Sequence, residues 1–182
     1  IYNCHLKPHI SQLMNKHTNI CLNVILDHSR HLLNRLHDNS IDVCFSYLAT
    51  NEISYKCIPY KTDEIIFVTN SQNIQFSNGI HNGEILHLPI IYSKFMPKSG
   101  FDWIHDIFPP HYVFQFTISV IKEIIPFLLQ YPYYAFLPRK LIEKELKDGL
   151  LIEIPLLDYH IPPLQSYIIM KSNAKYNPLD YF

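Results

Sequence analysis

The stretch that decides the fold is YYAFLPRKLIEKELKDGLLIEIPL, residues 133–156. A short apolar run comes first, then a helical pattern that Pro138 opens and Gly149 closes, then a second apolar run. Proline suits the first turn of a helix and glycine the position just after its last turn. Two strands joined through one helix by short links form a βαβ unit. No catalytic pattern lies within the stretch.

The flanking sequence repeats this alternation of strands and helices. Residues 5–17 and 27–39 have helical spacing of apolar side chains, and each is followed by a strand-like run. Alternating helices and strands predict parallel strands in an α/β sheet. The polar, turn-rich residues 71–83 read as a loop outside the core, after which the pattern restarts. Strands are expected at 19–26, 41–48, 54–60, 63–70, 88–93, 111–118 and 162–172, and helices also at 100–108, at 119–131 with a kink at Pro126, and in the tail 177–182.

Composition excludes several classes of protein. The 182 residues are 48% hydrophobic and 17% charged, which is typical of a globular chain. A net charge of −1 argues against binding phosphate backbones by charge alone. No apolar run approaches the ~20 residues that span a membrane. With 4 glycines and no glycine-rich phosphate loop, we expect no nucleotide cofactor.

Cysteines and histidines give no sign of a metal centre. Cys4, Cys21, Cys44 and Cys57 lack CxxC spacing and fit reduced thiols in a cytoplasmic protein, with disulfides or a metal site as the alternatives. His28 lies three residues before the next histidine of a predicted helix, but no third ligand completes a site. We therefore expect neither a metal nor a cofactor.

Hydroxyl-bearing residues recur where the predicted strands end. Ligands of open α/β sheets bind beyond the carboxyl ends of the strands, facing helix N-termini. A serine before a helix is also an ordinary helix cap, and a phenylalanine packs in many loops, so each position has a purely structural alternative. The set includes no nucleophile–base pair, which predicts a binding protein for a small polar molecule or anion and not an enzyme. The candidate residues are Ser29, Ser46, Tyr47, Ser93, Ser99, Phe101, Thr117 and Ser119.

The chain resembles the effector-binding (regulatory) domain of LysR-type transcriptional regulators. Residues 22–47 are similar to that family's strand, hydroxyl-bearing turn, helix and G-x-I-D strand. Residues 63–70 and 84–93 resemble the crossing strand and the L-x-x-x-P-x-I segment, and the opening stretch resembles G-I-x-x-L-P…G-x-L-x-x-L-P-L. One departure is YPYY, where Tyr131 and Tyr133 replace small residues of the family.

The resemblance implies a type 2 periplasmic-binding-protein-like fold of two α/β subdomains. Subdomain I would comprise 1–66 plus 163–182 and subdomain II 67–162, joined by two crossover segments, with a small polar or anionic effector in the cleft. The family's DNA-binding winged helix would precede this chain, and we expect the family's first strand to be missing from its start. The effector contacts carried over from the family are Ser29, Tyr47, Ser93, Ser99, Phe101 and Ser119.

The resemblance also implies a homodimer. The family pairs its first helix, whose apolar stripe here is Leu6, Ile10, Leu13 and Met14, with a helix of a second chain, here in 119–130. The function expected is effector sensing and dimerisation within a bacterial, cytoplasmic regulator. Two other classes stay open: a solute-binding protein of a transport system with the same fold, and an enzyme on a similar two-lobed scaffold.

Overall fold

The computed structural model describes residues 1–17, 19–93 and 103–173. The chain divides into two compact units, residues 1–62 with 165–182 and residues 63–164. We describe them separately as unit 1 and unit 2.

Unit 1 combines a three-stranded sheet with helices from its N-terminal half. A π-helical turn, Tyr2–Leu6, leads into α1 (Lys7–Lys16), and α2 (Ser29–His37) follows later. The sheet has the order β1 (Val43–Ser46), β8 (Leu164–Lys171), β2 (Tyr55–Asp63). β1 and β8 run antiparallel with Cys44 opposite Ile169. Strands thus form within residues 41–48, 54–60 and 162–172 as predicted, although β8, the neighbour of β1 in the described sheet, runs antiparallel to it.

The core of unit 1 forms where α2 meets the sheet. Leu36 of α2 is fully buried against Cys44 and Ile169, and Leu32, Leu33, Tyr55 and Cys57 pack around these three residues. The helix ends at His37 with Asp38 as its C-cap, and the next residue, Asn39, has a φ of 60° in the left-handed region. Ser40 N–H then donates to Arg35 O at 2.9 Å, which closes the last turn. The packing of Leu36 on Cys44 and Ile169 therefore holds α2 against the sheet.

Unit 2 is built around β3 (Ile65–Asn70), which lies between β6 (Tyr134–Pro138) and β7 (Leu151–Glu153). Both neighbours run antiparallel to β3. β4 (Ile91–Ser93) and β5 (Phe116–Ile118) pair in parallel, and a parallel bridge between Ile90 and Tyr134 joins β4 to β6. The helical elements are α3 (Asn82–Ile85), α4 (Trp103–Ile107), a 3₁₀ turn at Ile121–Glu123, α5 (Ile124–Gln130), a second 3₁₀ turn at Arg139–Ile142 and α6 (Glu143–Lys147).

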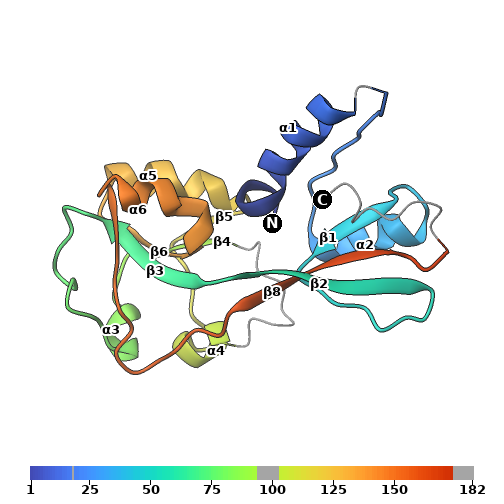
Figure 1. Cartoon of the computed structure of the whole chain (residues 1–182). Coiled ribbons are helices and arrows are strands. Elements are labelled where there is room, and N and C mark those ends of the chain that lie inside the picture. Colours follow the sequence, from blue (N-terminus) through green and yellow to red (C-terminus); the bar gives the residue numbers. More distant parts are fainter. Residues whose placement is uncertain (18, 94–102, 174–182) are drawn as a thin grey trace. The chain divides into compact units, whose positions relative to one another are not determined.

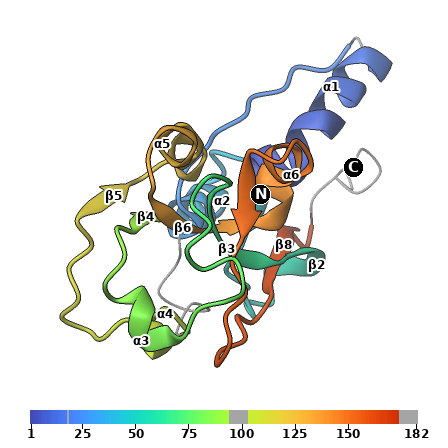
Figure 2. The same cartoon turned by 90° about the vertical axis from the view of Figure 1, so that its left-hand side faces the viewer.

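Helices cover both faces of the unit 2 sheet (Figures 1 and 2). α5 and α6 lie on one side, where Ile66, Val68 and Leu137 form an aliphatic core with Ile124 and other residues of this face. α3 and α4 lie on the other side. There the strands present aromatic rings, with Phe67 packed on Phe136 (4.6 Å between centroids) and Trp103 on Phe136 (5.2 Å). Side chains of a strand alternate between its two faces. The continuous apolar run of β3 therefore contributes to two different cores, one on each face of the sheet.

The opening stretch forms a split βαβ unit. β6 and β7 are parallel to each other, as the sequence predicts, but β3 lies between them and is antiparallel to both. Gly149 has φ of 68° and ends the helix as expected. Arg139 reinforces the unit by pairing with Glu64 next to β3 and with Glu153 at the end of β7.

Three expectations from the sequence are wrong. Residues 19–26 form no strand in the described residues. The strands are mainly antiparallel, and β4–β5 is the parallel ladder of the described chain. Pro126 does not kink a helix, because α5 begins at Ile124 and the proline lies in its first turn, where no N–H partner is required. The predicted tail helix at 177–182 lies outside the described residues.

Candidate functional site

Two predicted site residues of unit 1 lie side by side. Ser29 is the first residue of α2, and Tyr47 directly follows β1. The Tyr47 N–H donates to Ser29 Oγ at 3.2 Å, which connects the strand end to the start of the helix. Ser29 makes no capping bond, since His28 holds the N-cap position. Its hydroxyl therefore accepts one hydrogen bond and has its own proton available for a ligand, as far as the described chain shows.

The neighbouring candidate Ser46 is committed to local structure. Its side chain is fully buried, and its hydroxyl accepts from Leu48 N–H at 2.8 Å and donates to Leu48 O at 2.9 Å. Tyr47 is also buried, and its hydroxyl accepts from the Ile1 amino group at 3.1 Å. Ser46 therefore shapes the turn after β1, and Ser29 is the half-exposed hydroxyl of this group.

A carboxylate lies at the N-terminus of α2. Asp27 Oδ1 accepts from His28 N–H at 2.8 Å and lies 3.0 Å from His31 Nδ1. The hydrogen bond with His31 and then the one from the His28 backbone lower the pKa of Asp27. Its negative charge offsets the positive end of the helix dipole. Arg35 Nε also lies 3.9 Å from Asp27 Oδ2, so the charge of Asp27 is partly compensated by its neighbours.

Three predicted residues of unit 2 come together at the end of a parallel ladder. Ser93 ends β4 opposite Ile118 of β5, and Thr117 lies opposite Tyr92. Ser119 directly follows β5. Ser93 is buried, whereas Thr117 and Ser119 are exposed. Parallel strands end at the same edge of a sheet, so one edge of unit 2 carries all three hydroxyls.

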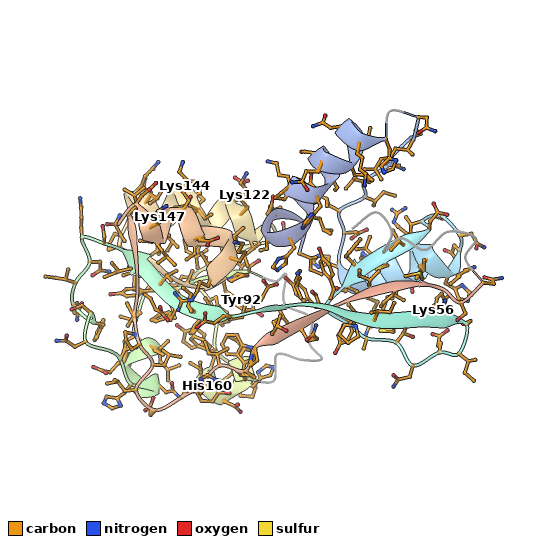
Figure 3. The ribbon with its side chains drawn as sticks, viewed as in Figure 1. Lys56, Tyr92, Lys122, Lys144, Lys147 and His160 are labelled. Atoms are coloured by element: carbon orange, nitrogen blue, oxygen red, sulfur yellow. The ribbon has the colours of Figure 1, made fainter. Side chains whose placement is uncertain are left out.

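The side chains at this edge point to different faces. Ser93 follows Ile91 on the aliphatic face, and Tyr92, labelled in Figure 3, faces the aromatic side, where it stacks on Phe114 at 4.3 Å between centroids. Burial raises the pKa of Tyr92, so its hydroxyl stays protonated at neutral pH. The helix expected directly at Ser119 begins later, with a 3₁₀ turn at Ile121 and α5 at Ile124. Ser119 is thus a loop hydroxyl and no helix cap.

Two further candidates, Ser99 and Phe101, lie outside the described residues. Within the described part of the chain, no cluster of three or more metal-ligating side chains is found. None of the helices described there is both long and apolar enough to cross a bilayer.

Residues that the sequence reasoning missed line a pocket in unit 1. They are His37, Glu52, Ser54, Tyr55, Lys171, Ser172 and Asn173, which enclose about 480 Å³. They come from the end of α2, the segment that leads into β2 and the end of β8. The end of β8 is more than 100 positions from the other two segments, and Ser172 N–H donates to Ser54 O. No local pattern could therefore have revealed the pocket.

The comparisons with known proteins place the chain in a family. The model of the LysR substrate binding domain matches residues 1–179. The chain therefore belongs to the LysR substrate-binding domain family, whose fold is the type 2 periplasmic-binding-protein-like α/β fold. The resemblance stated from the sequence is confirmed.

Solved structures of LysR-type regulators share the fold. The CrgA regulatory domain from Neisseria meningitidis has a TM-score of 0.75 at 12% identity, covering 97% of this chain and 86% of that one. A hydrogen-peroxide-bound OxyR mutant from Corynebacterium glutamicum has a TM-score of 0.70 at 18% identity, covering 95% and 56%. The BenM effector binding domain with its effector benzoate has a TM-score of 0.66 at 15% identity, covering 97% and 81%.

The present chain thus spans a little over half of the OxyR chain. No curated protein matches it.

Proposed function

We propose that this chain is the effector-sensing and dimerisation domain of a bacterial LysR-type transcriptional regulator. The observation that carries the proposal is the family match over residues 1–179. The grouping of hydroxyls at strand ends supports it: Ser29 with Tyr47 in unit 1, and Ser93 with Thr117 and Ser119 in unit 2. We take units 1 and 2 as the two regulatory subdomains.

The proposed effector is a small polar molecule held by hydroxyls and backbone donors. Neither hydroxyl group includes a lysine or arginine, and Asp27 places a negative charge at the start of α2. A neutral hydrogen bond contributes about 1 kcal/mol net and a charged one somewhat more. Binding is therefore of moderate strength, and a singly charged or neutral ligand fits better than a polyanion. Ser99 and Phe101 remain part of this proposal through the family resemblance.

The remaining parts of the proposal follow from chemistry and family. A net charge of −1 does not suit direct contact with DNA, so we assign DNA binding to a separate domain of the regulator. The hydroxyl groups include no nucleophile–base pair, so we assign the chain no catalytic role and no cofactor. Four cysteines without pairing spacing fit a cytoplasmic location.

The effector proposal is tested by removing one hydroxyl. A thermal-shift screen of small organic acids and sugars, benzoate included, selects a ligand, and calorimetry then gives its affinity for wild type, Ser29→Ala and the exposed loop control Ser77→Ala. We expect Ser29→Ala to weaken binding about fivefold to tenfold, the value of one hydrogen bond. Affinity that is equal in all three proteins would remove Ser29 from the site.

Dimerisation is proposed to use α1 and α5. Of the predicted stripe on the first helix, Leu6 and Leu13 are buried within the chain, while Ile10 is half-buried and Met14 is 41% exposed. Ile10 and Met14 thus remain for a partner, and in a two-fold dimer α1 of each copy would contact α5 of the other copy.

We expect Met14→Glu to convert the dimer to monomer in sedimentation velocity at micromolar concentration, because a buried carboxylate would be left unpaired. Lys16→Glu, about 200° around the same helix, is the control and should stay dimeric. A wild-type monomer, or a Met14→Glu dimer, would contradict the interface.

A further inference from the structure

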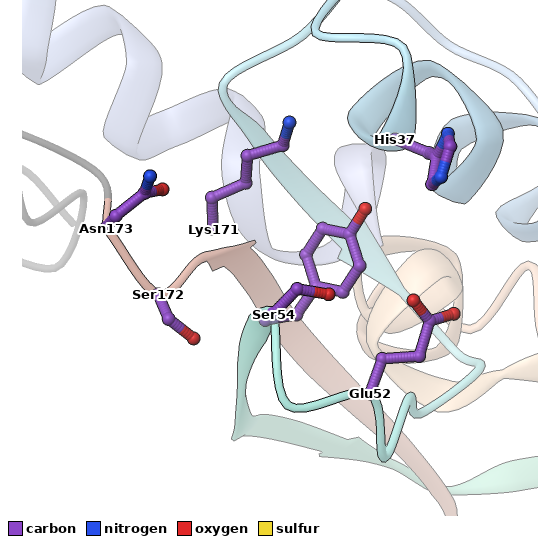
Figure 4. Close-up of a pocket in the computed structure, with 7 residues that line it drawn as sticks. His37, Glu52, Ser54, Lys171, Ser172 and Asn173 are labelled. Carbon is purple, nitrogen blue, oxygen red and sulfur yellow. The ribbon is translucent and has the colours of Figure 1, made fainter.

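The pocket of unit 1 is a built feature of the fold (Figure 4). Its volume of about 480 Å³ lies within the range of small-molecule sites. Its seven lining residues all belong to unit 1, and the hydroxyl groups that we assign to the effector include none of them.

Backbone hydrogen bonds hold two walls of the pocket together. Ser172 N–H donates to Ser54 O at 2.9 Å, and Ser172 Oγ donates to Ile53 O at 3.0 Å. Tyr55 N–H donates to Glu52 O at 3.0 Å, which folds the segment before β2 into a turn. The end of β8 and the start of β2 therefore form one edge of fixed geometry.

The third wall is the end of α2, which carries His37. Lys171 Nζ donates to Asn39 Oδ1, and Asn39 is the residue with positive φ that follows the C-cap of α2. Tyr55 packs on the core formed by Leu36, Cys44 and Ile169. The pocket thus rests on the hydrophobic core of unit 1, which limits its collapse in the absence of a ligand.

The pocket carries one charge of each sign. The Lys171 ammonium comes from β8, and the Glu52 carboxylate comes from the turn before β2, from the other side of the pocket in Figure 4. The Lys171 ammonium has three N–H donors; one bonds to Asn39 Oδ1 and two are available for a ligand. Within the described residues, the Glu52 carboxylate has no ion-pair or hydrogen-bond partner. Two opposite charges thus line one pocket, and no ion pair joins them in the described part of the chain.

We propose that this pocket binds a small zwitterion of the amino-acid type, with its carboxylate on Lys171 and its ammonium group on Glu52. His37, Ser54 and Asn173 supply further polar contacts. A simple anion would meet Glu52 and a simple cation would meet Lys171, so each single charge is opposed by one of the two residues. The site is independent of the proposed effector site and would give the domain a second input.

The probe for this site is L-alanine, titrated into the isotopically labelled chain and followed by backbone amide NMR. Both charged residues are solvent-accessible, so the interaction is screened and we expect a Kd of about 1–10 mM. Amides of Tyr55 and Ser172 should shift. Propionate and ethylamine carry one of the two charges each and should bind at least about threefold more weakly at equal ionic strength.

Four variants decide the assignment. Lys171→Met and Glu52→Gln should each weaken L-alanine binding about threefold to tenfold. Lys56→Met is the matched control, because Lys56 follows Tyr55 on β2 and extends into solvent (Figure 3); it should bind as wild type does. Ser29→Ala should also leave the shifts unchanged, which separates this site from the effector site. Pocket amides that do not move, variants that bind as wild type does, or propionate that binds as tightly as L-alanine would each overturn the proposal.

Discussion

Gly79→Ala is the substitution whose cost is best defined by the structure. Gly79 has φ of 115°, a conformation that residues with a side chain rarely adopt. A Cβ placed there would lie 2.8 Å from Leu157 Cγ and 3.2 Å from Pro155 O. Leu157 is 53% exposed and can move aside. Pro155 O cannot, because it accepts a hydrogen bond from Ile80 N–H at 2.9 Å. The ladder that connects residues 155–157 to Ile80 would therefore be distorted.

The magnitude follows from two contributions. Forcing alanine into a sparsely populated backbone region costs about 1–3 kcal/mol, and overpacking against a fixed carbonyl adds about 1 kcal/mol. We expect Gly79→Ala to lower the free energy of unfolding by about 2–4 kcal/mol, measured by equilibrium unfolding in urea. Two other glycines separate the contributions. Gly149 has a φ of 68°, and a Cβ added there would meet no atom within 4 Å. Gly149→Ala should therefore lower the free energy of unfolding by about 1–2 kcal/mol, from the backbone conformation alone.

Gly83→Ala is the control without either contribution. Its Cβ would meet no atom within 4 Å, and it lies in α3 with ordinary helical φ. Alanine there should leave stability unchanged or raise it by up to about 1 kcal/mol. The expected order of stability is Gly83→Ala, then Gly149→Ala, then Gly79→Ala. If Gly79→Ala were as stable as Gly83→Ala, the tight approach of residue 79 to 155–157 would be refuted.

Two further predictions concern titrating groups. Burial raises the pKa of Cys44 to about 12, so a thiol reagent at pH 8 should modify the exposed Cys21 in the native chain and Cys44 only after unfolding, as followed by mass spectrometry; equal rates would contradict the burial. The pKa of Asp27 is lowered in the folded chain, first by its hydrogen bond with His31, so its contribution to stability is present above its ordinary value of 3.8 and is lost as pH falls through the folded value. The difference in melting temperature between wild type and Asp27→Asn should therefore be largest near pH 6 and shrink towards pH 3, whereas a constant difference would show that ionisation of Asp27 does not matter.

Local sequence signals predicted elements better than their pairing. Pro138 and Gly149 bound the helix of the βαβ unit because both act within the chain itself, through a fixed φ and a permitted positive φ. The apolar run of β3 is buried on both faces, and such a run reads the same in parallel and antiparallel sheets. Its insertion between β6 and β7 was therefore not visible.

The segment 19–26 was predicted as a strand and forms none in the described chain. Its residues have strong β preference, but in the described chain no strand pairs with them, and Val24 and Leu26 are 43% and 65% exposed. A strand forms only where a neighbouring strand takes up its backbone hydrogen bonds, so propensity alone gave a wrong prediction.

The sequence predicted the location of the candidate hydroxyl residues better than it predicted the charged groups around them. Ser93 and Ser119 lie at strand ends as predicted, whereas the strand predicted before Ser29 does not form in the described chain; Ser29 lies beside the end of β1, where it meets Tyr47. The role of Asp27 depends on the fold of the turn before α2, and the pocket at Lys171 depends on contacts between distant segments. Both are tertiary features that no local pattern encodes.

The measurement that tests the central claim most directly is native mass spectrometry of the chain after incubation with a small-molecule extract of bacterial cells. An effector-binding domain should retain a molecule of low mass. Ser29→Ala and Ser119→Ala, one hydroxyl from each unit, should each retain clearly less, while Ser77→Ala retains as much as wild type. A wild-type chain that retains nothing, or variants that retain as much as wild type, would contradict an effector site built on these hydroxyls.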